Sequence, residues 1–362
     1  MTVSTSVPAA PAVLNPDALN ALVGQMINDL GAAVGGALVL LGDRLGLYRS
    51  LAETGPTTSA ELARSTGLDE RYLREWLSAQ AASGYVDYDG ASEAFSMTPE
   101  QVAVFADSES PVAMTGGFYS VASVYHDQPL VEAAFRTGDG VAWGDHHNCL
   151  FCGTERFFRP GYAANLVQEW IPALDGVEEK LLAGASVADV GCGHGASTLI
   201  MARAFPQSEF VGFDIHPASI DAARQHAAEQ GIRNVRFETA SAQDFPGSGY
   251  DLVTTFDALH DMGDPVGAAA HTRQALAPDG TWMIVEPMAG DTLADNLNPV
   301  GRVYYGFSTM VCTPSSLSQN VGLALGAQAG ERRLGEVVGE GGFTRFRRAT
   351  QTPVNMILEA RP

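Results

Sequence analysis

The chain has 362 residues, which is enough for two domains, because a single hydrophobic core usually stops growing below about 300 residues. Hydrophobic residues make up 46% of it and charged residues 17%, a composition typical of a packed globular protein rather than a disordered one. The formal net charge of -21 disfavours binding to nucleic-acid phosphates or anionic lipid surfaces, since both kinds of binding depend on Lys and Arg.

Cysteine content and the N-terminal residues bear on the compartment. Four cysteines are too few for a disulfide framework, and the N-terminus lacks the charged and apolar regions of a signal peptide. We therefore expect a cytoplasmic protein with reduced thiols. The apolar stretch Gly31 to Leu41 is shorter than the roughly 20 residues that span a bilayer, so a buried helix and no membrane segment are expected there.

The first 110 residues predict a mainly helical winged-helix domain. Apolar residues recur at helical spacing through the first 50 residues, after a Pro/Ala-rich leader. A short helix capped by Gly67 precedes a second helix that begins after Asp69 as N-cap. The segment YVDYDGASEAFSMT then alternates around an Asp89-Gly90 turn, as a two-stranded wing would.

A winged helix can bind DNA, but the charge of this one argues against it. Residues 1–110 carry five arginines against fourteen Asp and Glu, a net charge of -9. In the second helix Arg71 and Arg74 are flanked by Glu70 and Glu75, so the basic surface of a DNA reader is missing. We therefore regard nucleic acid as an unlikely partner, and the exposed-face pattern of the first helices suggests a homodimer. The alternative is a cofactor-binding transcriptional regulator.

Two further regions are candidates for the wall of a substrate pocket. Residues 111–170 predict a helical linker rich in aromatic residues and histidine, although packing between domains would explain these residues as well. The segment Ala289 to Gln328 suits an apolar cover over an acceptor, or a dimer surface. The candidate pocket residues are Tyr119, His126, Trp143, His146, Tyr305 and Met310.

Residues 171–362 predict an α/β domain with a ligand site. Ser186 to Val190 is a short apolar strand, followed at once by the glycine-rich turn GCGHG and a helix. Glycines let the backbone turn tightly and approach a ligand closely. The next strand, QSEFVGFD, ends at Asp214, whose carboxylate can accept hydrogen bonds from ribose hydroxyls. Strands then alternate with helices through VRFETASAQDF, YDLVTTFDAL and GTWMIVEPM, which implies a parallel sheet with the ligand at the carboxyl ends of the strands.

A nicotinamide dehydrogenase is the main alternative for such a domain. However, the turn reads GxGxG rather than GxGxxG, and Asp189 precedes it. The series ADVGCGHGAS, VGFD, SAQDF and LAPDGTWMIVEP, over roughly residues 160–362, resembles that of class I S-adenosylmethionine-dependent methyltransferases. The segments GGFTRFRRAT and TPVNMILEARP resemble the antiparallel hairpin that completes the seven-stranded, mostly parallel, Rossmann-like sheet of that family.

The resemblance implies that residues 1–110 are a dimerisation and substrate-lid domain, because many small-molecule methyltransferases carry such a module before the catalytic one. It also implies a cofactor, a reaction and a set of contacts. The cofactor is S-adenosyl-L-methionine, and the reaction is methyl transfer to a small, apolar or aromatic acceptor. The glycine turn would hold the methionine end, Asp214 the ribose, and Ile215 the adenine. The family often has an acid where Ser241 stands, and Asp257 would contact the methionine amino group or act as an ordinary cap. The residues so assigned are Asp189, Gly191, Cys192, Gly193, Gly195, Asp214, Ile215, Ser241, Ala242, Gln243 and Asp257.

The segment ALHDMGDP supplies the candidate catalytic residues, His260 and Asp261. It is similar to the His-Asp segment of winged-helix O-methyltransferases, although the tryptophan usual after that pair is Met262 here. A neutral imidazole can accept a proton near neutral pH, so His260 is the candidate general base and Asp261 would orient it. A purely structural histidine is the alternative.

The segment from His146 to Cys152 holds four possible soft metal ligands within seven residues. Seven contiguous residues rarely close a tetrahedral site, so no metal is expected. Capture of a thiophilic substrate by Cys149, Cys152 and Cys312 is no stronger as a hypothesis than metal binding.

Overall fold

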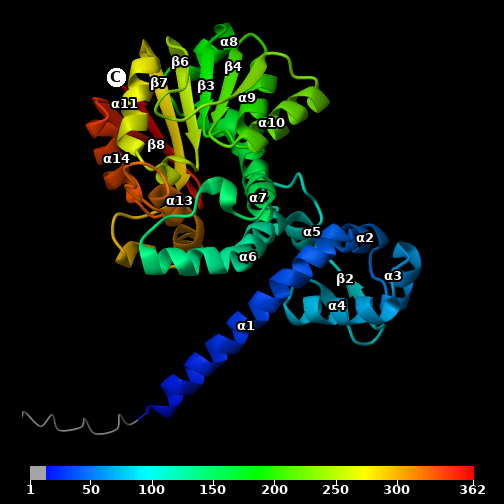
Figure 1. Cartoon of the computed structure of the whole chain (residues 1–362). Coiled ribbons are helices and arrows are strands. Elements are labelled where there is room, and N and C mark those ends of the chain that lie inside the picture. The colour runs from blue at the N-terminus through cyan, green and yellow to red at the C-terminus, as the bar shows by residue number, and fades with distance from the viewer. Residues whose placement is uncertain (1–13) are drawn as a thin grey trace, which may run out of the picture. The chain divides into compact units, whose positions relative to one another are not determined.

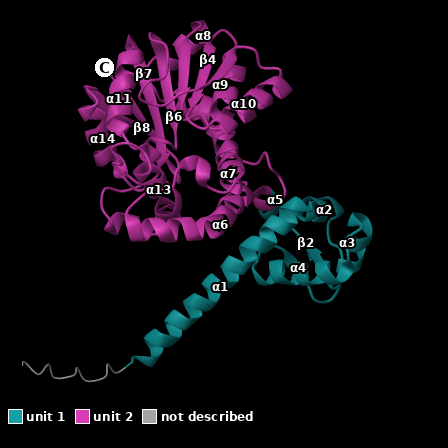
Figure 2. Cartoon of the chain, in the orientation of Figure 1, with its two compact units in different colours: residues 1–102 teal, residues 103–362 magenta. Residues whose placement is uncertain are grey.

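The computed structural model describes residues 14–362, and the chain divides into two compact units, residues 1–102 and 103–362 (Figures 1 and 2). Unit 1 has the order of a winged helix, with a small antiparallel sheet after its helices. Its elements are α1 (Pro16–Arg44), α2 (Leu47–Thr54), α3 (Ser59–Thr66), α4 (Glu70–Ala82), β1 (Asp87–Asp89) and β2 (Ala94–Ser96), followed by α5 (Pro99–Phe105).

Local sequence signals place the boundaries of these helices. Thr58 caps α3 through a capping box with Glu61, and Gly67 ends the helix in the left-handed conformation. The side chain of Asp69 accepts hydrogen bonds from the first turn of α4. In α4, Arg71 and Arg74 each form an ion pair with a glutamate of the same helix, at 2.6 Å.

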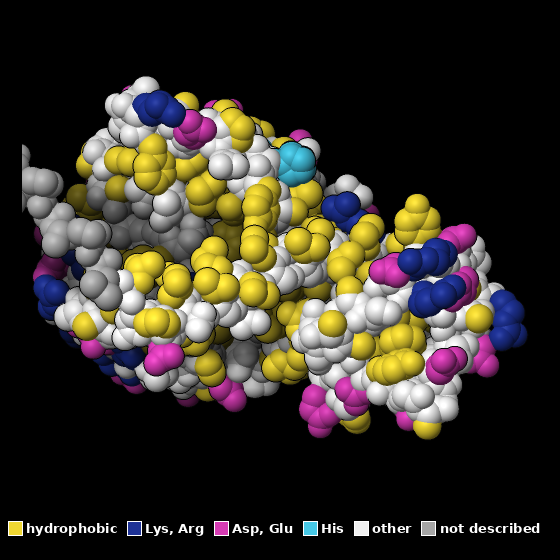
Figure 3. Space-filling model, turned by 90° about the horizontal axis from the view of Figure 1, so that it is seen from below, with side chains coloured by type: hydrophobic (Ala, Val, Ile, Leu, Met, Phe, Trp, Pro, Cys, Tyr) yellow, Lys and Arg dark blue, Asp and Glu magenta, His cyan; other side chains and the backbone are white. Residues whose placement is uncertain are grey.

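The prediction of a buried helix at Gly31–Leu41 is wrong for this chain. The stretch belongs to the 29-residue helix α1, in which only Gly36, Val39 and Gly42 are buried. By length and composition alone α1 could cross a membrane, so the expectation of no membrane segment stays a prediction. Figure 3 shows hydrophobic side chains along its exposed length. They include Leu19, Leu22, Val23, Met26, Ile27, Leu30 and Val34.

Unit 2 is built on a seven-stranded sheet in the order β5-β4-β3-β6-β7-β9-β8. The first five strands in this order pair in parallel and the last two pair antiparallel, as the sequence predicts. The third predicted strand is shorter than expected, because β5 ends at Thr239 and the following residues form a loop. The strands are β3 (Ser186–Val190), β4 (Glu209–Asp214), β5 (Val235–Thr239), β6 (Tyr250–Phe256), β7 (Leu276–Pro287), β8 (Arg345–Gln351) and β9 (Asn355–Arg361).

Helices cover both faces of this sheet (Figure 1). One core packs α11 (Pro265–Ala275) and α14 (Gly330–Glu340) against side chains such as Val190 and Ile284. The other core packs the π-helix η2 (Leu166–Trp170), α8 (Val177–Ala183) and α9 (Ala196–Ala204) against the opposite face. Alternate residues of the inner strands serve the two cores, so these strands are apolar throughout. Helix α10 (Pro217–Gln230) packs beside α9.

The remaining helices gather near the carboxyl edge of the sheet. Helices α6 (Thr115–Thr137) and α7 (Cys149–Asn165) lie against each other, because Gly116 and Gly153 allow close contact between their backbones. The insertion after β7 forms α12 (Pro299–Phe307), the π-helix η5 (Ser308–Cys312) and α13 (Thr313–Leu317). Short 3-10 turns complete the unit, namely η1 (Trp143–Asp145), η3 (Leu259–Asp261) and η4 (Ala294–Asn296).

Candidate functional site

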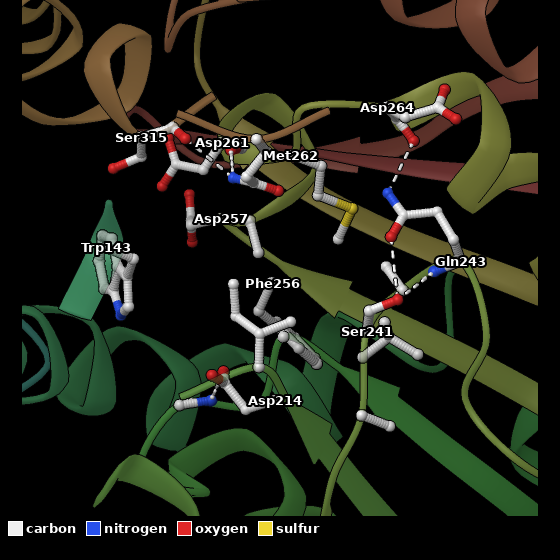
Figure 4. Close-up of a pocket in the computed structure, with 18 of the residues that line it drawn as sticks. Trp143, Asp214, Ser241, Gln243, Phe256, Asp257, Asp261, Met262, Asp264 and Ser315 are labelled. Atoms are coloured by element: carbon white, nitrogen blue, oxygen red, sulfur yellow. Dashed lines mark hydrogen bonds between the residues drawn. The ribbon is translucent and has the colours of Figure 1, made fainter. Parts of the chain in front are cut away.

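A cavity of about 720 Å³ opens at the carboxyl ends of the parallel strands (Figure 4). Most of the residues predicted to bind a cofactor line it, although they come from loops after four different strands. Those residues are Gly191, Gly193, Asp214, Ile215, Ser241, Ala242, Gln243 and Asp257, together with Trp143 and Asp261.

The glycine turn after β3 forms one wall of the cavity. Gly191 and Gly193 have φ of 77° and 53°, values that side-chain-bearing residues rarely adopt. Gly195 caps α9, where a Cβ would lie 2.8 Å from the ring of Phe237. The turn thus presents backbone rather than side chains to the cavity, at the positive end of a helix.

Three of the predicted cofactor residues do not line the main cavity. Asp189 is fully buried beneath the turn and accepts hydrogen bonds from Ser197, Thr198 and Thr254 at 2.5–2.9 Å. Cys192 is buried and lines a smaller neighbouring pocket, and Gly195 lies behind the turn. In this structure Asp189 therefore holds β3, β6 and α9 together.

Asp214 is the carboxylate at the tip of β4. Its oxygens accept hydrogen bonds from the backbone N–H groups of Gly193 (2.9 Å) and His216 (2.8 Å), which ties the glycine turn to this strand. Burial raises the pKa of its carboxyl although both hydrogen bonds oppose this. Ile215 follows it with 48% of its surface exposed.

The loop after β5 forms the opposite wall, as Figure 4 shows. Ser241 Oγ donates a hydrogen bond to Asp244 Oδ1 at 2.8 Å, and Gln243 Nε2 donates to the backbone oxygen of Asp264 at 3.3 Å. An acid is therefore present in this loop, three residues after the position where the family often has one.

Asp257 follows β6 and points into the cavity with an unusual backbone. Its φ of 47° is uncommon for a residue with a side chain. Its carboxylate accepts hydrogen bonds from Tyr162 Oη at 2.7 Å and Asn355 Nδ2 at 2.8 Å. Burial, with a smaller effect from Glu286, raises the pKa of this carboxyl to about 7.

A second chamber of about 310 Å³ adjoins the first, because Trp143, Thr154, Phe158, Asp257 and Asp261 line both. It is enclosed by α6, α7, α12 and η5. Its other lining side chains are mostly apolar and include Met114, Phe118, Val121, Leu150, Phe157, Val303, Tyr304, Phe307 and Val311.

His260 lies in the polar part of the chamber wall. Its Nδ1 is 2.6 Å from Glu286 Oε2 and must carry the hydrogen, because a carboxylate only accepts. Its Nε2 lies 3.3 Å from Asp261 Oδ1. Burial opposes the charged imidazolium, but the carboxylates of Glu286 and Asp261 outweigh it and raise the pKa of His260 well above its usual 6.5.

Five of the six predicted pocket residues do not line either cavity. Tyr119 is buried under the guanidinium of Arg156, and His126 stacks on His147 at the surface. His146 is buried and bonds to Asp127 at 3.0 Å. Tyr305 and Met310 are half-buried, while neighbouring residues line the chamber in their place. Of the six, Trp143 is the one that lines the cavities.

Three further residues, Glu286, Tyr162 and Asn355, belong to the site but were not predicted from the sequence. For Glu286 a signal existed, because a lone acid near the end of the apolar strand TWMIVEP is costly to bury without a partner. Tyr162 and Asn355 reach Asp257 across 95 and 98 residues of sequence, and no local pattern marks them.

Comparison with known proteins agrees with this architecture. Residues 181–328 match a family model described as a methyltransferase domain. This part of the chain is a methyltransferase domain. Residues 33–106 match a model described as an Rv2258c-like winged HTH domain, so a winged helix precedes it.

Two curated relatives are methyltransferases by name. Aklanonic acid methyltransferase DauC of Streptomyces sp. is 33% identical over 114 residues, which are 29% of this chain and 49% of that protein. A ubiquinone biosynthesis O-methyltransferase of Bordetella avium is 32% identical over 133 residues, 36% of this chain and 52% of that protein. The chain thus spans about half the length of the curated relatives it matches.

Solved structures share the fold over nearly the whole chain. Mitomycin 7-O-methyltransferase has a TM-score of 0.65 at 20% identity, covering 96% of this chain and 100% of that one. Human N-acetylserotonin methyltransferase, solved in complex with SAM, has a TM-score of 0.66 at 18% identity, covering 94% and 99%. An O-methyltransferase family protein from Burkholderia thailandensis has a TM-score of 0.66 at 19% identity, covering 97% and 99%.

The raised pKa of Asp257 makes a prediction about stability. Its pKa in the folded protein, about 7, exceeds the value of about 3.9 in an unfolded chain, so the folded state keeps the proton longer and loses stability as pH rises between these values. Asp257→Asn cannot ionise. Denaturant unfolding at several pH values should show the stability of the wild type falling relative to this variant by on the order of 1 kcal/mol per pH unit from pH 5 to 7. Parallel curves would contradict the assignment.

Proposed function

We propose that this protein is an S-adenosylmethionine-dependent methyltransferase that acts on a small, apolar or aromatic acceptor. The observation that carries the proposal is the pair of adjoining cavities. One has a glycine turn and a buried carboxylate at its rim, and the other is apolar with a histidine in its wall. The names of the relatives support the same reaction class.

The larger cavity would hold the cofactor. The glycine turn would face its methionine end, the Asp214 carboxylate would accept hydrogen bonds from the ribose hydroxyls, and Ile215 would contact the adenine. Asp257 lies toward the second chamber, where a carboxylate suits the ammonium group and the sulfonium of the cofactor. A cofactor bound in this way would direct its methyl group toward the smaller chamber, across the residues that line both cavities.

The smaller chamber would hold the acceptor. Its aromatic and aliphatic lining suits a flat, apolar compound, and charged side chains are confined to the wall next to the cofactor. Methyl transfer from a sulfonium is an in-line displacement, so the protein mainly has to position the acceptor and remove its proton.

His260 is our proposed general base, and Glu286 positions it. The Glu286 carboxylate also accepts the backbone N–H of Leu259 at 3.0 Å, which fixes the turn that carries the histidine. Because two carboxylates hold His260 protonated, it must lose its proton before it can act as a base. The cationic cofactor, bound next to it, would favour this loss.

The winged-helix part is proposed to mediate homodimer formation rather than DNA binding. Both arginines of α4 are already paired with glutamates of that helix, whereas α1 exposes apolar side chains over a length of about 43 Å. The acidic residues Asp17, Asp29 and Asp43 on α1 outnumber its one arginine, which favours a second copy of this helix over an anionic membrane surface. We also propose a cytoplasmic location.

Product analysis tests the reaction. Incubation with methyl-labelled cofactor and a panel of phenols, thiols and amines should transfer label to an apolar acceptor. Asp214→Ala should weaken cofactor binding, measured by isothermal titration, by about 10- to 100-fold, because it removes a charged hydrogen-bond acceptor. The matched control Asp221→Asn, at an exposed position of α10, should bind normally. Failure of every acceptor, together with selective retention of operator DNA, would favour the regulator instead.

Two substitutions test the proposed base His260 and its partner Glu286 separately. His260→Ala should lower turnover by roughly 10² or more and leave cofactor affinity intact. Glu286→Gln removes the charge that raises the pKa of His260, so the rising limb of the kcat/KM profile should move to lower pH. Unchanged turnover of His260→Ala would remove this residue from the mechanism.

The oligomeric state tests the role of α1. Light scattering should give the mass of two chains for the wild type and of one chain for a variant with Leu22→Glu, Met26→Glu and Leu30→Glu, since charges would then replace the apolar face. Tyr72→Glu, at a still more exposed position on α4, is the control and should stay dimeric. A monomeric wild type that floats with lipid vesicles would assign the helix to a membrane.

A further inference from the structure

Three potential metal ligands converge in the wall of the apolar chamber. His260 and Asp261 lie on η3, and Cys312 ends the π-helix η5 of the insertion. One ligand atom from each lies within 4.8 Å of the other two. They come from two segments about 50 residues apart in sequence, unlike the contiguous cluster from His146 to Cys152. Cys312 is the last residue of a π-helix, and π-helices are rare and often occur at functional sites.

The histidine of this cluster is held as metal-binding histidines usually are. Its Nδ1–H donates to the buried Glu286 carboxylate at 2.6 Å, which fixes the ring and leaves Nε2 on the side of Asp261 and Cys312. A carboxylate behind the imidazole is the usual outer partner of a metal-ligating histidine. Glu286 is only 2% exposed, and it is also held by the backbone N–H of Leu259.

Asp261 offers the oxygen ligand of this cluster. Its buried Oδ1 lies 3.3 Å from His260 Nε2, and the thiol of Cys312 also faces this carboxyl group. In the free protein a proton on Nε2 lies between the imidazole and the carboxylate. A divalent cation could take the place of this proton and contact Nε2, Oδ1 and the sulfur of Cys312 together.

We propose that His260, Asp261 and Cys312 form a binding site for one Zn²⁺-like divalent transition-metal ion. The set offers one nitrogen, one oxygen and one sulfur, and all three residues line the chamber, so the fourth position of a tetrahedron opens toward it. Binding releases the thiol proton of Cys312 and the Nε2 proton of His260 to solvent, and forms a metal–thiolate and a metal–imidazole bond with no change in oxidation state. The site does not depend on the proposed methyl transfer, but a metal on Nε2 would occupy the nitrogen that the proposed general base needs, so His260 cannot play both roles at once.

The test uses the full chain, freed of metal with a chelator and kept reduced, without cofactor or acceptor. Co²⁺ is the probe, because a bound thiolate gives a charge-transfer band in the near ultraviolet. We expect one equivalent to bind with this band and to be displaced by Zn²⁺. Cys312→Ser should abolish the band and weaken binding by at least about tenfold, and Asp261→Asn should weaken it similarly.

A matched control and a second measurement keep the outcome clear. Cys152→Ser, at an exposed thiol of α7, should leave the band and the affinity unchanged. Circular dichroism checks that each variant is folded, and if Cys312→Ser does not fold, Cys312→Ala replaces it. The proposal is overturned if the wild type binds no Co²⁺ with a thiolate band, or if the band survives at Cys312 variants. Either result leaves the methyltransferase assay unaffected, so the two proposals fail separately.

Discussion

Burial of carboxylates at the carboxyl edge of the sheet is the constraint on which the site depends. Asp189, Asp214, Asp257 and Glu286 lie at or next to the ends of β3, β4, β6 and β7, and all are buried except Asp257, which is half-buried. A buried charge is tolerated only where donors surround it. Hydroxyls serve Asp189, backbone amides serve Asp214, and a histidine serves Glu286. These bonds fix the loops around the cavity, and the excess of negative charge there suits a cationic ligand.

Asp257 receives its hydrogen-bond donors from elements that are distant in the sequence. Its left-handed backbone costs roughly 1–2 kcal/mol for a residue with a Cβ, so it persists only where neighbours determine it. Tyr162 from α7 donates a hydrogen bond to one of its oxygens, and Asn355 from β9 donates one to the other. The helical wall of the chamber and the C-terminal hairpin thus meet at one carboxylate. Since Asp257 lines both cavities, the same clamp fixes their common wall.

The sequence predicted the sheet and the glycine turn well, because both rest on local patterns. An apolar run followed by GCGHG and a helix strongly favours a strand, a glycine turn and a helix. Asp214 ends the next parallel strand, so it must lie at the same edge of the sheet. The chamber could not be predicted in the same way. Tyr119 and Phe118 are adjacent in sequence, yet only Phe118 lines it, because the packing of α6 on α7 decides which side of each helix is free. The exposure of α1 escaped prediction since an apolar composition does not say what covers it.

The polar end of the chamber requires a positive charge, and its identity decides the chemistry there. Glu286 and Asp261 face His260 from its two ring nitrogens, so a neutral imidazole would leave one carboxylate without a partner. An imidazolium meets the need in the free protein, and a divalent ion on Nε2 would meet it equally. When neutral His260 accepts a proton from the substrate, it becomes the imidazolium that Glu286 and Asp261 stabilise. The same two carboxylates therefore make His260 slow to lose its own proton and favour its uptake of the substrate proton.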